Sequence, residues 1–310
     1  VFEKTNINDF IFNSNPTINN LGFYSNYDFI VKNVNSNTQN SENFEENSDY
    51  YLSSIFQFNS SLPLIKQNKK YQKVLKPKIS LKMSPNNTKN IRNEETRVDA
   101  NNLFDIERIS KKDTIEGGIS LAIGNDFSIF DKTRFREILG IKLANNLRLE
   151  ENDDLPRTNQ LGSKTSNFFG EIAFNPNDYF STSYNTSIKN NLNETSYQSL
   201  ETEISINNFV TTFDYINENN TKEKNTYLKN TTQFSFNETN NLLFSTRRNK
   251  KTDLTEYYNL MYQYKNDCLA ASIEYNKDYY SDRDVKPEES IFFKLTIIPF
   301  GETSSPNLKD

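Results

Sequence analysis

Residues 74–83 read VLKPKISLKM, and from Leu75 onward apolar and polar side chains alternate without a break. Each even position from 76 to 82 is Lys or Ser. The odd positions are apolar, and they are Leu75, Pro77, Ile79, Leu81 and Met83. Successive side chains of a β-strand point to opposite faces, whereas a helix would spread these positions around its circumference. The stretch therefore predicts a strand with one apolar and one charged face.

The same period of two recurs along the whole chain. Apolar and polar residues alternate in 138–149, 168–174, 200–206, 258–264, 269–275 and 291–297. Short turns rich in Asn and Asp separate some of these segments, at 175–178, 207–208, 237–240 and 265–267. Longer polar segments form the other connections, at 33–50, 84–114, 150–166, 217–226, 247–255 and 276–290. Because Asn and Asp tolerate the backbone of tight hairpins, the pattern predicts antiparallel neighbours.

Three all-β architectures are compatible with such strands. A soluble sandwich rarely sorts its short and long connections onto opposite ends, and a solenoid needs a fixed sequence period, which this chain lacks. A transmembrane barrel accounts for alternating faces, short turns at one end and long loops at the other. We therefore predict a partial antiparallel up-and-down transmembrane β-barrel with roughly 14–15 strands. Since the chain has no Trp, Tyr and Phe must form any aromatic girdle.

The expected organisation is a single unit followed by a short tail. We assign residues 1–300 to the partial barrel, with 84–114 as a long outer loop, and residues 301–310 to a C-terminal tail. The strand count begins at a weak strand in 1–13, and single-chain bacterial barrels have an even number of strands. We therefore expect the chain to be the C-terminal part of a larger barrel wall.

The composition excludes several classes of function. The 310 residues contain no His and one Cys, with 36 basic against 41 acidic side chains. Without His there is no Ser-His-Asp triad and no His-ligated zinc, and one Cys cannot form a disulfide within the chain. The acidic balance argues against nucleic-acid binding, and the chain has no P-loop pattern. We expect no enzymatic activity, no catalytic residue, no cofactor and no bound metal.

Four short stretches differ from this alternating background. The first is Asn101-Asn102-Leu103-Phe104, followed by Arg108, Asp113 and Glu116-Gly117-Gly118. The others are the strand at 75–81, the segment 161–176, and 264–270 together with 291–301. In this order and spacing they resemble the LPS-assembly protein family LptD, whose sequences contain a similar NLF…R…D…EGG stretch. The resemblance extends over about 75–310, while residues 1–70 agree only in general character.

The resemblance implies a lipopolysaccharide (LPS) translocon in the outer membrane of a Gram-negative cell. A protein of this family receives LPS from periplasmic bridge proteins through an N-terminal domain that has no counterpart in this chain. It delivers the lipid to the outer leaflet through a lateral opening between its first and last strands, and an LptE-like lipoprotein plugs its lumen. The expected partners are therefore LPS, these proteins and membrane lipid.

The resemblance also assigns roles to particular residues. It implies a disulfide between Cys268 and a cysteine outside this chain, although an inert thiol is the alternative. It places the lateral seam at the last strand, with Ile291, Phe293, Leu295 and Ile297 facing lipid and Pro299 either weakening the seam or merely ending the strand. Within the outer-loop motif, formed by Asn102, Leu103, Phe104, Arg108, Asp113, Glu116 and Gly117, we expect three charged residues to form an ion network (Arg108, Asp113 and Glu116). A solvated loop is the alternative.

Other functions remain open from the sequence. A porin-like channel or receptor barrel of the outer membrane has the same strand pattern and is the main alternative. The strands of a soluble β-sandwich adhesin would also show alternating apolar and polar residues. An outer-membrane lipid hydrolase is disfavoured because the known types rely on His, which is absent.

Overall fold

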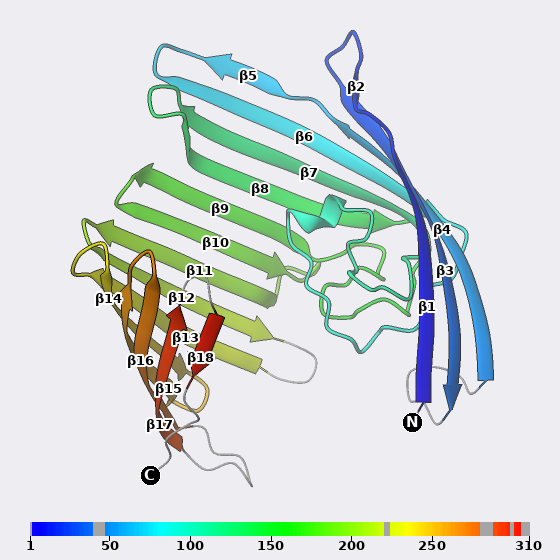
Figure 1. The fold of residues 1–310 in the computed structure, drawn as a ribbon. Coiled ribbons are helices and arrows are strands. Elements are labelled where there is room, and N and C mark those ends of the chain that lie inside the picture. Colours follow the sequence, from blue (N-terminus) through cyan, green and yellow to red (C-terminus); the bar gives the residue numbers. More distant parts are fainter. Residues whose placement is uncertain (1, 40–46, 220–223, 280–287, 298–300, 305–310) are drawn as a thin grey trace. The chain divides into compact units, whose positions relative to one another are not determined.

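The computed structural model describes residues 2–39, 47–219, 224–279, 288–297 and 301–304. In this part of the chain the regular structure is an antiparallel up-and-down sheet, apart from one turn of 3-10 helix, η1 (Asn102–Phe104) (Figure 1). Among the described residues no helix has the length and apolar character needed to span a membrane. Of the 18 strands, β2, β5 and β18 have four residues or fewer, which leaves 15 long strands. The all-β, up-and-down prediction is confirmed.

The contacts of the chain divide it into two compact units. Unit 1 comprises residues 1–172 and 185–196, and unit 2 comprises residues 173–184 and 197–310. Strands β9 (Phe168–Asn177) and β10 (Phe180–Ile188) contribute residues to both units.

Unit 1 contains the N-terminal strands. They are β1 (Phe2–Asn13), β2 (Thr17–Ile18), β3 (Tyr24–Gln39), β4 (Asn47–Ser61), β5 (Leu64–Gln67), β6 (Tyr71–Ser84), β7 (Gly118–Asp131) and β8 (Arg136–Arg148). The long strands pair in the order β1, β3, β4, β6, β7 and β8, and β2 and β5 pair with the ends of β3 and β6. The weak strand at 1–13 is thus a regular strand of the sheet.

Unit 2 contains most of β11 and all of the later strands. They are β11 (Thr195–Ile206), β12 (Phe209–Asn219), β13 (Lys224–Ser235), β14 (Asn240–Asn249), β15 (Leu254–Lys265), β16 (Leu269–Asp278), β17 (Glu288–Ile297) and β18 (Gly301–Ser304). Each pairs with the next in sequence. Residues 301–304, expected in the C-terminal tail, form β18.

Four connections are shorter than predicted. Strands continue into both ends of the polar segments 33–50, 217–226, 247–255 and 276–290. Their polar residues pair across the ladder, as Asn217 does with Thr226 and Tyr227 with Asn249. The polar residues of these segments therefore belong to the ends of strands, where the backbone is still paired.

Asn side chains organise the tight turns. Asn237 Oδ1 accepts hydrogen bonds from the backbone N–H of Thr239 (3.0 Å) and Asn240 (2.9 Å) between β13 and β14. Asn266 Oδ1 accepts from Cys268 (3.0 Å) and Leu269 (2.8 Å) in the same way between β15 and β16. These Asx turns provide the conformations that a chain with few glycines needs.

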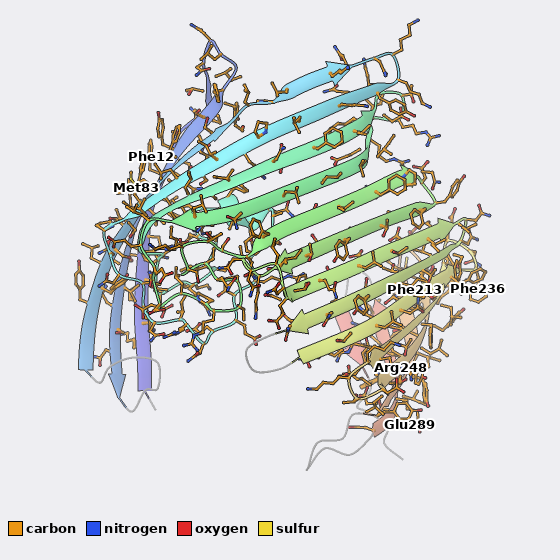
Figure 2. All side chains as sticks on the ribbon, turned by 180° about the vertical axis from the view of Figure 1, so that it is seen from behind. Phe12, Met83, Phe213, Phe236, Arg248 and Glu289 are labelled. Carbon is orange, nitrogen blue, oxygen red and sulfur yellow. The ribbon has the colours of Figure 1, made fainter. Side chains whose placement is uncertain are left out.

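The two faces of the unit 1 sheet are reversed relative to a soluble protein. Along β6, Ser80, Lys82 and Ser84 are buried, whereas the alternating apolar residues, including Ile79 and Met83, are exposed. Figure 2 shows Met83 and Phe12 projecting from the strands of this unit. Soluble antiparallel sheets bury their apolar face, so this arrangement is the one expected where lipid covers the outside.

Unit 2 has the same reversal. Phe213, Ile273 and Phe293 are exposed, and Ser290, on the opposite face of β17 from Phe293, is buried. Phe213 is labelled in Figure 2. Both units therefore expose apolar side chains on their strands.

Candidate functional site

Two long connections of unit 1 fold together against one face of its sheet. These segments, residues 85–117 and 149–167, are named the plug here, and the face that they cover is named the inner face (Figure 1). A backbone hydrogen bond from Ile91 N to Asp154 O (2.8 Å) joins the two segments. A second bond runs from Asn159 Nδ2 to the carbonyl of Thr96 (3.1 Å). The plug is therefore a folded body rather than two independent loops.

The plug has its own hydrophobic core. Seven of the buried side chains come from the plug and three from the sheet, the set being Ile91, Val98, Ala100, Leu103, Ile109, Leu155, Leu161, Ala122, Ala144 and Phe169. Two of the three sheet residues are alanines, so the plug packs close to the backbone of β7 and β8. Burial of these groups stabilises the docked plug through the hydrophobic effect.

A glycine in β7 makes room for the Phe104 ring. A Cβ atom at Gly124 would lie 2.6 Å from Phe104 Cζ and 3.0 Å from the carbonyl oxygen of Leu143. The ammonium group of Lys78 lies 4.2 Å from the centroid of the Phe104 ring, within the range of a cation–π interaction. The aromatic residue of the NLF stretch is thus held against the inner face.

Arg108 and Glu116 form a buried, bidentate ion pair. Arg108 Nε donates to Glu116 Oε2 at 2.6 Å, and Nη2 donates to Oε1 at 2.5 Å. A second arginine, Arg148 of β8, donates from Nη1 to Glu116 Oε1 at 2.5 Å. Arg108 and Glu116 belong to the plug and Arg148 to the sheet, so one carboxylate joins the plug to the wall.

The remaining donors of Arg108 are also satisfied. Nη1 donates to Asn146 Oδ1 (2.9 Å) and to the carbonyl of Leu103 (3.2 Å), and Nη2 donates to Ser120 Oγ (2.9 Å). The side chain of Arg108 is 1% exposed. Because every donor group reaches an acceptor, the guanidinium group can remain buried.

Glu116 is held in its charged form. Burial by itself would raise the pKa of this carboxyl, but the charge and hydrogen bonds of Arg108, together with Lys82 and Arg148, hold the pKa well below its usual range. Lys82 lies on β6 and donates from Nζ to the carbonyl of Asp105 in the plug. Glu116 therefore carries its charge at neutral pH and joins Arg108 and Arg148 in a structural cluster.

Two of the three charged residues of the outer-loop motif come together, and the third does not. Asp113 forms an ion pair with Lys89 at 2.6 Å, and both side chains are partly exposed. Glu116 is instead shared by Arg108 and Arg148, and Asp113 pairs separately with Lys89.

The other residues of the motif shape the plug backbone. Asn102 Oδ1 accepts from Asp99 N (2.9 Å), and its Nδ2 donates to the carbonyl of Arg97 (3.0 Å). Leu103 is fully buried in the plug core. At Gly117 a Cβ would lie 2.1 Å from the carbonyl oxygen of Asn86, so only glycine fits there. The motif therefore encodes how the plug folds.

The structure places the seam candidates on β17. Ile291, Phe293 and Ile297 are exposed, and β17 pairs with β16 on one side and with β18 on the other. Leu295 is half-buried and pairs with Ala271. Pro299 lies outside the described residues. Cys268 is a free, exposed thiol in the turn before β16.

Sequence reasoning missed three buried cations of unit 1. The sequence pattern placed Lys82 only on the charged face of its strand and gave no role to Arg148 or Lys32. Lys32 is 1% exposed and binds Asp9 of β1 at 2.8 Å and Glu107 of the plug at 3.4 Å. Lys82 and Arg148 lie at polar positions of alternating strands, but such positions also carry exposed charges, and Lys32 shares its face of β3 with the buried Ile30 and Val34. The partner that buries each cation comes from a distant segment.

These features define a class of protein. A sheet that buries charge under a folded plug on one face and exposes apolar side chains on the other has the architecture of a transmembrane β-barrel protein. A family model for LptD, LPS transport system D, matches residues 20–247. Because the match covers more than half of the chain, this protein belongs to the LptD family, a component of LPS transport and not a family of enzymes. No curated protein matches the chain.

Proposed function

We propose that this chain forms part of the wall of an outer-membrane translocon that delivers LPS to the outer leaflet through a lateral opening. The observation that carries the proposal is the family match over residues 20–247. The exposed apolar face and the buried polar inner face support a membrane location, because hydrocarbon favours apolar side chains outside a fully paired sheet.

The plug restricts the path that LPS can take through the protein. It covers the inner face of β6, β7 and β8 with a packed core and a buried ion cluster. A wide diffusion channel, as in the porin-like alternative, needs an open inner face, and this unit has a filled one. We therefore favour passage of the lipid between strands, with its acyl chains in the membrane.

The partners belong to the same proposal. The energy for transport comes from outside this chain, through periplasmic bridge proteins, and an LptE-like lipoprotein occupies the lumen. Cys268, exposed in a turn, is proposed to bond a cysteine outside this chain. In the full-length protein a maleimide should label Cys268 only after reduction, and labelling without reductant would refute the bond.

The lateral route can be tested with a photoreactive amino acid on β17. Phe293 is exposed and pairs with Ile273, whereas its neighbour Phe292 lies on the opposite face and pairs with Glu274. During LPS transport in cells, a photoreactive side chain at position 293 should capture LPS more efficiently than one at position 292.

Phe213 is the control for simple contact with the membrane. It is exposed on β12 to 44%, close to the 46% of Phe293, and it lies away from the proposed seam. If LPS is captured equally at 213 and 293, bulk lipid explains the contact and the lateral route at β17 is wrong.

A further inference from the structure

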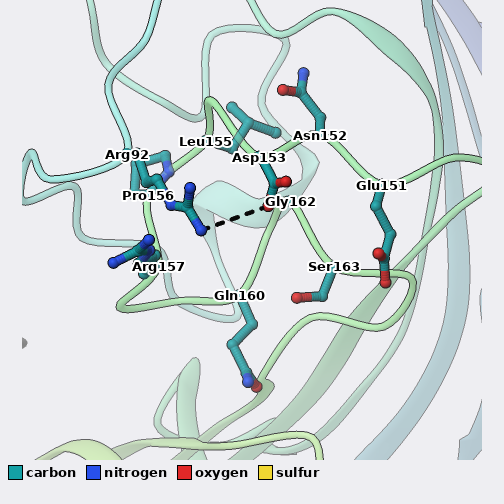
Figure 3. Close-up of a pocket in the computed structure, with 10 residues that line it drawn as sticks. All are labelled: Arg92, Glu151, Asn152, Asp153, Leu155, Pro156, Arg157, Gln160, Gly162 and Ser163. Carbon is teal, nitrogen blue, oxygen red and sulfur yellow. Dashed lines mark ion pairs between the residues drawn. The ribbon is translucent and has the colours of Figure 1, made fainter.

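The plug contains a cavity that the ion cluster does not use. Its volume is about 220 Å³, and its walls come from residue 92 and from residues 151–163. Figure 3 shows Arg92 and Arg157 on one side, and Glu151 and Ser163 on the other. The cavity thus has a cationic side and a side that carries a hydroxyl and a carboxylate.

The two arginines have unused hydrogen-bonding capacity. Arg157 N donates to the carbonyl of Arg92 at 3.3 Å, which places the two residues side by side. Arg92 Nε is buried without a hydrogen-bond partner, and Nη2 lies 3.7 Å from Asp153 Oδ1. Within the described part of the chain no partner is found for the side chain of Arg157. Donors of this kind suit an anion with several oxygens.

The weak Asp153 contact does not block such an anion. The Asp153 side chain is 89% exposed, and an ion pair this exposed contributes little to stability. Phosphate offers Arg92 a bidentate contact that a carboxylate at 3.7 Å does not make. An entering phosphate can therefore displace Asp153 toward solvent.

The cavity is held in shape by its backbone. Asn152 N donates to the carbonyl of Gly162 at 2.8 Å, and a Cβ at Gly162 would lie 2.1 Å from the carbonyl oxygen of Asn152. The side chain of Asn152 also bonds Thr88 Oγ1 at 2.9 Å, across to the other segment of the plug. A site that is already formed binds at a lower entropic cost than one that must order on binding.

We propose that this cavity binds a sugar that carries a phosphate group. The phosphate binds Arg92 and Arg157, while Ser163 and Glu151 hydrogen-bond hydroxyl groups of the sugar ring. The inference rests on the proposed function, in that it names the phosphorylated saccharide part of LPS as the group that contacts the plug.

The test uses the full-length protein in detergent and glucose 6-phosphate as the probe. Saturation-transfer NMR titrations would compare this probe with glucose and with inorganic phosphate. The double variant R92Q/R157Q should bind glucose 6-phosphate at least about a hundredfold more weakly, since two charge-assisted contacts are lost. The variant R134Q is the matched control, because Arg134 is exposed in the turn between β7 and β8.

The outcomes separate the site from the transport function. Weak binding by the double variant and normal binding by R134Q support the site, with circular dichroism to show that both variants fold. Absent binding in the wild type, binding unaffected in R92Q/R157Q, or equal affinity for inorganic phosphate would overturn it. Rescue of LPS delivery by the wild type in depleted cells reports on the proposed function alone, whichever result the titration gives.

Discussion

At Lys82 and Met83 the chain passes in one step from a buried ammonium group to an exposed thioether. Lys82 is 1% exposed and Met83 is 39% exposed. Alternation along β6 explains why the two differ, but not which of them is covered. The covering group is the plug, which brings the carbonyl of Asp105 to Lys82.

Glu116 should matter more than any other acidic residue of the plug. In the Glu116→Gln variant Arg108 and Arg148 remain buried with no counter-charge, and loss of one partner of a buried pair costs about 3–5 kcal/mol. We expect a clearly lower urea midpoint and faster proteolysis within 85–117. The control is Asp113→Asn, which breaks a partly exposed pair and should cost about 0–1 kcal/mol. Equal effects of the two variants would contradict a dominant role for the buried cluster.

The stability contributed by Glu116 should depend on pH only under acidic conditions. The pKa of Glu116 in the folded protein is well below its usual range, whereas in the unfolded chain it is about 4.3. The contribution is therefore complete above the unfolded pKa and is lost as the pH falls through the folded pKa. The free energy difference between wild type and Glu116→Gln should be constant near neutral pH and shrink in strong acid. Urea titrations at several pH values measure it, and a difference that disappears already at neutral pH would refute the assignment.

At the scale of elements, the plug depends on the small residues of the strands beneath it. Ala122, Ala144 and Gly124 let the plug core approach the backbone of β7 and β8. Large side chains at these positions would separate plug and sheet, with loss of buried area.

The variant Gly124→Ala tests this close approach. Its new methyl group would lie 2.6 Å from Phe104 Cζ, so the ring must move and the plug should become more sensitive to protease. Gly170→Ala on β9 is the matched control, because its nearest contact is Thr186 Cγ2 at 3.2 Å. Similar protease sensitivity of the two variants would show that the fit at Phe104 does not hold the plug.

At the scale of the whole molecule, the surrounding solvent decides which face must be apolar. In water, the exposed apolar side chains of unit 1, such as Ile79 and Ile123, would form an apolar surface of the kind that leads to aggregation. In a bilayer the same surface is the stable one.

The effect of a charged substitution on the unfolding free energy distinguishes a lipid-covered face from a water-exposed one. Ile123 and Ile119 lie on one face of β7, with 43% and 41% exposure, but Ile119 lies near the end of the strand. In lipid vesicles Ile123→Arg should lower the unfolding free energy by about 2–4 kcal/mol, and Ile119→Arg by about 0–1 kcal/mol. If both substitutions cost less than about 0.5 kcal/mol, as is usual on a water-exposed surface, the sheet is not embedded in lipid.

Local patterns in the chain predict the alternating strands, the Asn-rich turns and the family, because each depends on residues close together in the sequence. They also single out Arg108 and Glu116, which are eight positions apart. The folded molecule is needed to see that Arg148 shares Glu116, that Asp113 binds Lys89, and that Lys32 and Lys82 are buried. Burial of a charge depends on partners from distant segments, and the alternation of one strand carries no information about which loop will cover it.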